Sequence, residues 1–164
     1  MQAGPVNEAL KPLCWLIGKW KSVCAKGQYP TIKPFTYCEE MEFISVGQPM
    51  LNYKSVTWHP EKKNPMHLES GFLRIKPGTN QLAFMVGHNF GITTLEEGTV
   101  GENCLDLKTT AIGRMCFAKD PAVTEVTRHF QYCPESQHLQ AVVCMATCNT
   151  PLTEHLRITY EKSC

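Results

Sequence analysis

The sequence predicts an all-β fold in which about ten short strands close into an antiparallel up-and-down barrel. From Gly18 onward, apolar and polar residues alternate with the period of two that marks half-buried strands. The alternating runs are short and evenly spaced, and turn residues rather than helical patterns separate them. A sandwich would also fit, but we favour the barrel because closure leaves no sheet edge exposed.

The residues before Gly18 carry the one helical pattern that we find in the sequence. Asn7 can cap a helix over residues 7–17, and Pro12 interrupts it. We therefore expect one or two turns of helix that cover one end of the barrel. The apolar stripe of this helix is predicted to contain Leu10, Leu13, Cys14 and Ile17.

The remaining chain divides into alternating runs joined by turn residues. Residues 27–31 read as a loop because of Pro30, either a lip over a cavity or an ordinary connection. A barrel of this width is expected to leave room inside for a ligand. The predicted strands are 19–26, 35–45, 50–59, 67–76, 81–88, 91–100, 103–109, 114–118, 123–132, 139–147 and 153–161.

Composition excludes several classes of protein. The chain of 164 residues is 43% hydrophobic and 19% charged, which is ordinary for a single globular domain over 1–164. The net charge of +1 offers no basic stripe for nucleic acid. The sequence contains neither an apolar run long enough to cross a membrane nor a secretion signal at its start. We expect a cytoplasmic protein, with the nucleus as a further location.

The nine cysteines do not form a recognisable framework. Their number is odd, they are scattered, and most lie inside apolar strand-like runs. Cys144 and Cys148 are the nearest pair, but no second pair accompanies them to bind zinc. We interpret the cysteines as reduced thiols that mostly pack in the core, with Cys164 exposed and open to oxidation.

His155 is the first candidate for a functional residue. It lies at the start of the last strand, near the rim of the barrel, where a rigid backbone could hold it within reach of a ligand. A structural histidine is the alternative. By alternation His155 shares a face with Arg157 and not with Leu156 or Ile158. Either the strand bends near its start or the cavity faces the less apolar side.

One further histidine and two glutamates are also candidates for functional residues. His67 also begins a strand, and it either faces His155 across the mouth or is an unrelated surface histidine. Glu40 and Glu69 could form an acid–base pair, but we expect them on solvated faces or paired with arginines such as Arg74 and Arg114. The sequence contains no hydrolase elbow, phosphate loop or zinc-protease motif.

A set of short motifs extends through nearly the whole chain and is specific in its combination. The motifs are Gly18-x-Trp20, Tyr29-Pro30-Thr31, Pro34-Phe35, residues 46–52, His59-Pro60, Pro65-Met66-His67, Gly71-Phe72, residues 117–119, residues 145–147 and His155-Leu156. With these residues the chain resembles the nitrobindin family, in the form found as the C-terminal domain of animal THAP-domain proteins. The family pattern Gly-x-Trp-x-Gly-x-Gly is incomplete here, because Ser22 and Cys24 replace the second and third glycines.

The resemblance implies a ten-stranded barrel like that of fatty-acid-binding proteins, with haem b bound at one mouth. It implies that His155 is the axial ligand of a ferric haem iron. Thr31 would contact the haem, and Met66, His67 and Met145 would line the pocket around it. The implied activity is isomerisation of peroxynitrite to nitrate, together with reversible binding of nitric oxide.

Two other functions stay open at this point. The barrel could be a non-catalytic carrier of a fatty acid or another apolar small molecule, or an interaction module that has lost its cofactor. A fatty-acid carrier would need arginines deep inside the barrel, and the pattern does not assign Arg114, Arg128 or Arg157 to that role. The oligomeric state is also open, with a homodimer as one option.

Overall fold

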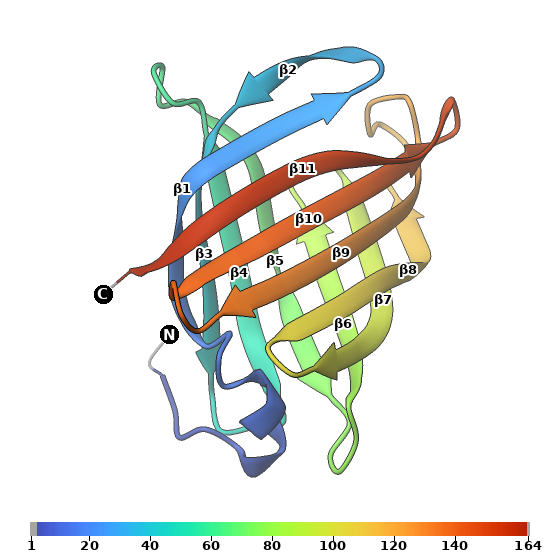
Figure 1. Ribbon diagram of the computed structural model, residues 1–164. Coiled ribbons are helices and arrows are strands. Elements are labelled where there is room, and N and C mark those ends of the chain that lie inside the picture. Colours follow the sequence, from blue (N-terminus) through green and yellow to red (C-terminus); the bar gives the residue numbers. More distant parts are fainter. Residues whose placement is uncertain (1–2, 164) are drawn as a thin grey trace.

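The computed structural model describes residues 3–163 and shows one sheet that closes on itself (Figure 1). Strands that follow one another along the barrel pair antiparallel, and β1 also pairs with β11. The prediction of a ten-stranded antiparallel barrel is confirmed, with β1 and β3 to β11 in the closed ring. The strands are β1 (Gly18–Tyr29), β2 (Ile32–Thr36), β3 (Cys38–Ser45), β4 (Met50–Trp58), β5 (Pro65–Ile75), β6 (Gln81–His88), β7 (Ile92–Gly101), β8 (Cys104–Arg114), β9 (Val123–Cys133), β10 (His138–Thr147) and β11 (Thr150–Ser163).

The short strand β2 lies outside the closed ring. The first half of β1 pairs with β3, whereas its second half pairs with β2 and projects beyond the barrel (Figure 1). The predicted loop at residues 27–31 was therefore wrong, since β1 continues to Tyr29 and only a two-residue turn follows. The predicted strand 35–45 is likewise two strands, β2 and β3, which separate at Tyr37.

The predicted strand 114–118 was also wrong. Strand β8 continues through Arg114, and the chain then turns outward, leaving Phe117 77% exposed. The Arg114 guanidinium donates hydrogen bonds to the backbone carbonyls of Ala118 and Lys119. An arginine side chain thus holds a turn where the apolar residues suggested a strand.

A short 3₁₀ helix, η1 (Glu8–Leu13), covers the end of the barrel opposite β2 (Figure 1). Asn7 caps it as predicted, accepting a hydrogen bond from the Ala9 amide at 3.0 Å. The buried residues of η1 are Leu10 and Leu13, which are three apart as in a 3₁₀ helix, and Leu16 continues this spacing in the turn that follows, so the predicted Cys14 and Ile17 are not part of the stripe. Within residues 3–163, no helix is long and apolar enough to cross a membrane.

Large side chains fill the barrel above this helix. Trp20 is buried and donates its indole N–H to the Leu16 carbonyl at 2.8 Å, so it closes the floor of the barrel. Tyr53, Tyr160 and Phe84 are also fully buried. The internal cavity that Tyr53 and Tyr160 help to line measures only about 30 Å³. The expectation of a roomy internal ligand site was therefore wrong, because aromatic rings occupy the width that ten strands provide.

The cysteines do not pack in the core. All eight within residues 3–163 are free, and none of them is buried. Cys24 illustrates the reason, since its position in β1 directs the side chain outward. The interpretation as reduced thiols agrees with the structure, whereas the packing role was wrong. Cys164 lies outside the described residues.

Replacing Leu13 with alanine should destabilise the protein by about 2–5 kcal/mol, because it empties part of the seal between η1 and the barrel. Lys11→Ala is the matched control, since Lys11 is exposed on the same helix and should change stability by less than about 0.5 kcal/mol. Urea unfolding followed by tryptophan fluorescence measures both. Equal effects of the two variants would contradict a sealing role for η1.

Candidate functional site

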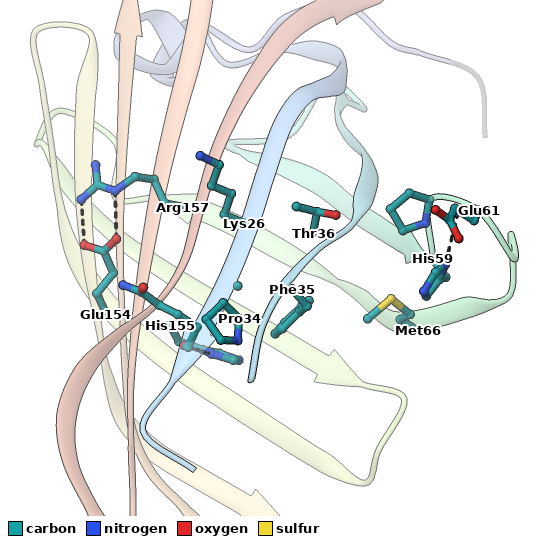
Figure 2. A pocket seen from close by; sticks show the side chains of 13 residues that line it. Lys26, Pro34, Phe35, Thr36, His59, Glu61, Met66, Glu154, His155 and Arg157 are labelled. Carbon is teal, nitrogen blue, oxygen red and sulfur yellow. Dashed lines mark hydrogen bonds and ion pairs between the residues drawn. The ribbon is translucent and has the colours of Figure 1, made fainter. Parts of the chain in front are cut away.

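A cleft of about 830 Å³ opens at the mouth of the barrel. Its walls come from the β1–β2 hairpin, from the start of β11 and from the connection between β4 and β5. Figure 2 shows Phe35 and His155 on one side of the cleft and His59 and Met66 on the other. Its volume is within the range of about 300–1,000 Å³ that is typical of small-molecule sites.

A β-bulge in β11 places His155 in this cleft. Val143 of β10 pairs with Leu156, but the next residue, Cys144, pairs with Glu154. His155 is therefore the extra residue of the bulge, and the alternation of β11 reverses at this point. Leu156 packs against the core and His155 lines the cleft directly above it. The bulge is the irregularity that the first predicted alternative required, and the second also holds, because Glu154 and Arg157 line the cleft beside His155.

The two ring nitrogens of His155 have different environments. Nδ1 lies 2.9 Å from the backbone carbonyl of Gln28 in β1, and a carbonyl can only accept, so Nδ1 carries the proton. In the neutral imidazole Nε2 then keeps its lone pair. Burial lowers the pKa of His155 below its ordinary value, although the hydrogen bond to Gln28 opposes this shift. The side chain is thus held as a neutral ligand.

Aromatic rings fix the orientation of this imidazole. The rings of Tyr29 and Phe35 meet His155 edge to face, with centroids 5.2 and 6.4 Å away. Phe35 reaches this position across Gly27, where a Cβ atom would lie only 2.1 Å from the Phe35 ring. A side chain at position 27 would displace Phe35, which explains why glycine occurs inside this strand.

The other predicted site residues are divided between the cleft and its surroundings. Met66 lines the cleft together with His155. His67 lies deeper and forms part of the wall of the internal cavity. Thr31 is exposed in the turn between β1 and β2, and the Met145 carbonyl accepts a hydrogen bond from the Tyr29 hydroxyl at 3.1 Å. The contacts of Thr31, His67 and Met145 with a ligand stay predictions.

A buried ion network lies below the cleft and was missed by the sequence analysis. Arg128 of β9 donates through Nη1 and Nη2 to Glu69 at 3.0 and 3.1 Å, and through Nε to Glu96 at 3.0 Å. The prediction for Glu69 was therefore wrong in both forms, since its side chain is buried and its arginine partner is Arg128 rather than Arg74 or Arg114. The alternation of β9 was the available signal, because it places Arg128 on the same inward face as Val126 and Phe130.

The network has opposite effects on two carboxyl groups. Burial would raise the pKa of Glu69, but the Arg128 guanidinium holds it well below the ordinary value. Glu39 makes no ion pair with Arg128, and burial raises its pKa to about 7 despite a hydrogen bond from Ser55. Glu69 is thus held in its ionised form, whereas Glu39 titrates near neutrality.

The two departures from the family's glycine pattern fit the local backbone. Ser22 lies where β1 stops pairing with β3, and its hydroxyl accepts a hydrogen bond from the Glu39 amide at 2.8 Å. The pairing of β1 with β11 shifts register between Ser22 and Cys24. Ser22 therefore satisfies a backbone donor at an irregular point of the strand, and the outward position of Cys24 needs no glycine.

Comparison with known proteins places the chain among haem-binding barrels. A family model described as "THAP4-like, heme-binding beta-barrel domain" matches residues 9–162. The human protein named peroxynitrite isomerase THAP4 is 43% identical over 158 residues, which are 96% of this chain and 27% of that protein. The chain thus spans about a quarter of the length of such animal relatives.

Two further relatives match over almost their whole length. A protein of Arabidopsis thaliana, named peroxynitrite isomerase Rv2717c, is 32% identical and is covered to 93%, with 98% of this chain aligned. The crystal structure of Rv2717c from M. tuberculosis superimposes with a TM-score of 0.88 at 32% identity, covering 98% of this chain and all of that one. The barrel therefore agrees with an experimental structure.

Replacing Arg128 with methionine should destabilise the protein by about 3–5 kcal/mol, because Glu69 and Glu96 would lose their buried counter-charge. Arg157→Met is the matched control, since Arg157 makes a similar pair with Glu154 on the exposed surface and should cost less than about 1 kcal/mol. Urea titrations at pH 7 compare them. A loss for Arg128→Met no larger than that of the control would refute the importance of the network.

Proposed function

This chain belongs to the family of THAP4-like haem-binding β-barrel domains, and from that premise we propose that it isomerises peroxynitrite to nitrate on a ferric haem b. The relatives named peroxynitrite isomerase support the reaction, and they include proteins that match along almost their entire length. The observation that carries the proposal is His155, whose unprotonated Nε2 faces a cleft of suitable size. Reversible binding of nitric oxide at the same iron belongs to the proposal.

The residues of the cleft fit a haem group. His155 offers one neutral imidazole nitrogen, and its other nitrogen is held by a backbone carbonyl, as is usual for metal-binding histidines. Phe35, Pro34 and Met66 provide apolar surface for the porphyrin. Lys26, whose ammonium makes none of the ion pairs found within residues 3–163, provides a positive charge for a propionate.

The role of the protein in the reaction follows from these contacts. A ferric haem supplies an electron-accepting coordination position at which peroxynitrite rearranges to nitrate. The Gln28 carbonyl keeps the proton of His155 on Nδ1, so that Nε2 stays available as the ligand. Tyr29 and Phe35 prevent the imidazole from rotating away. The cleft is open to solvent, so a small anion reaches it without a conformational change.

The carrier function is less well supported. The cavity inside the barrel is about 30 Å³, which is too small for an acyl chain. Arg128 is an arginine deep in the barrel, where a fatty-acid carrier would need one. Its guanidinium, however, already donates to Glu69 and Glu96, so it has no free edge for a ligand carboxylate.

Replacing His155 with alanine should abolish the Soret band of the haem-loaded protein and its peroxynitrite isomerase activity, because the axial ligand is lost. His138→Ala is the control, since His138 begins β10 at the other end of the barrel and should leave the band unchanged. Absorption spectra after haem addition and gel filtration compare the variants. An undiminished Soret band in His155→Ala would remove the assignment.

Haem retention should depend on pH through His155. Only the unprotonated imidazole binds iron, and burial lowers the pKa of His155 below the ordinary value of about 6.5. The haem should therefore stay bound at neutral pH and be released only as the pH falls below the ordinary value, through this lowered pKa. Transfer of haem to apomyoglobin, followed at each pH by its absorption, measures the retention. Release that begins between pH 8 and 7 would contradict a neutral, buried His155.

A further inference from the structure

Two histidines and a glutamate meet between the mouth cleft and the ion network. His67 is the third residue of β5, Glu69 follows two residues later on the same face, and His88 ends the neighbouring strand β6. Sheet pairing places Glu69 directly opposite His88. The side chains of His88 and Glu69 are 4% and 9% exposed, whereas that of His67 is 29% exposed toward the mouth. The group is therefore largely enclosed but can be reached from solvent.

The three ligand atoms form a nearly regular triangle. His67 Nε2 lies 3.0 Å from His88 Nδ1, and Glu69 Oε1 lies 3.3 Å from His88 Nδ1 and 3.6 Å from His67 Nε2. Ligands at about 2.0–2.1 Å around a tetrahedral zinc ion lie about 3.3–3.4 Å from one another. The triangle thus has the dimensions of one face of a four-coordinate metal site.

Hydrogen bonds orient His88 as a metal ligand. The Thr94 hydroxyl donates its proton to Glu96 at 2.8 Å, so it can only accept from His88 Nε2, which lies 3.2 Å away. In the neutral imidazole this leaves the lone pair of His88 on Nδ1, directed at Glu69 and His67. A histidine that donates its outer N–H toward a carboxylate network is the usual arrangement in metal sites.

The charges and the space around the triangle also favour a cation. The carboxylates of Glu69 and Glu96 share the single positive charge of Arg128, which leaves one negative charge unbalanced. A divalent ion would supply positive charge on the Glu69 side of this network. The internal cavity of about 30 Å³, lined by His67 and Glu69, has room for a water molecule as a fourth ligand.

We propose that His67, Glu69 and His88 bind one divalent transition-metal ion of the zinc class, separately from the haem at His155. Two imidazoles and one carboxylate suit Zn²⁺ and its neighbours, whereas Mg²⁺ and Ca²⁺ prefer oxygen ligands. Without the metal, the proton between the two rings lies between His67 Nε2 and His88 Nδ1. When the metal binds to both nitrogens, His67 carries its proton on Nδ1 instead. Arg128 keeps its hydrogen bond to the second carboxylate oxygen of Glu69, Oε2.

The test uses the full chain with its thiols alkylated, because exposed cysteines also bind zinc. Equilibrium dialysis of the haem-loaded protein against Zn²⁺ should show one ion bound per chain. In the haem-free protein, Co²⁺ should give the visible ligand-field absorption of a four-coordinate site, and Zn²⁺ should remove it. Failure to bind either ion would overturn the proposal.

Variants identify the ligands. Loss of an outer partner typically costs about 10–100-fold in metal affinity, so Thr94→Val should weaken binding by that factor and His88→Asn by more. Thr94→Val changes little volume, so it tests the site even if His88→Asn fails to fold. His129→Asn is the matched control, because His129 forms a histidine–carboxylate pair with Asp106 on the surface. Unchanged affinity in Thr94→Val would contradict the site.

His155→Ala separates this proposal from the haem function. The variant should lose haem but bind Zn²⁺ and Co²⁺ with the affinity of the parent, because His155 is not one of the three ligands. Conversely, His88→Asn should lose the divalent ion and retain the Soret band. Loss of Co²⁺ binding in His155→Ala would show that the ion occupies the haem ligand instead, and would overturn the proposal.

Discussion

The pairing of β1 with β11 is the constraint on which the rest of the structure depends. It joins the first and last strands of the barrel, from Lys19 opposite Ser163 to Gly27 opposite Leu156. This pairing leaves the ring without an open edge. It also brings the carbonyl of Gln28 to the imidazole of His155, which are 127 positions apart in the chain. The same strand pairing thus closes the barrel and fixes the imidazole that we propose as the iron ligand.

The barrel is divided into three levels along its axis. At the floor, η1 and Trp20 form an apolar seal. In the middle, Arg128 and its carboxylates fill the space between the aromatic rings. At the mouth, the β1–β2 hairpin rises above the ring and forms one wall of the cleft (Figure 1). The filled middle level leaves room for a large ligand only at the mouth.

A buried arginine with two carboxylates is costly to desolvate, and apolar side chains would fill the same volume at lower cost. The network is therefore better explained by what it organises than by the stability it adds. Through Glu96 and Thr94 it fixes the tautomer of His88, and through Glu69 it places a carboxylate beside His67. The polar chemistry of the mouth thus continues into the interior along defined hydrogen bonds.

The sequence by itself determined the elements that depend on local pattern. Alternation indicated most strands of the barrel, and the motifs indicated the family. The prediction that His155 starts the last strand was wrong, because β11 begins at Thr150 and His155 lies further along it. Only the tertiary structure decided the bulge that turns His155 inward, the 3₁₀ register of η1, and the partners of Arg128. Arg128 and Glu69 are 59 residues apart in the chain. Side-chain alternation is a property of neighbouring residues, whereas such partners are set by the register of strands far apart in the chain.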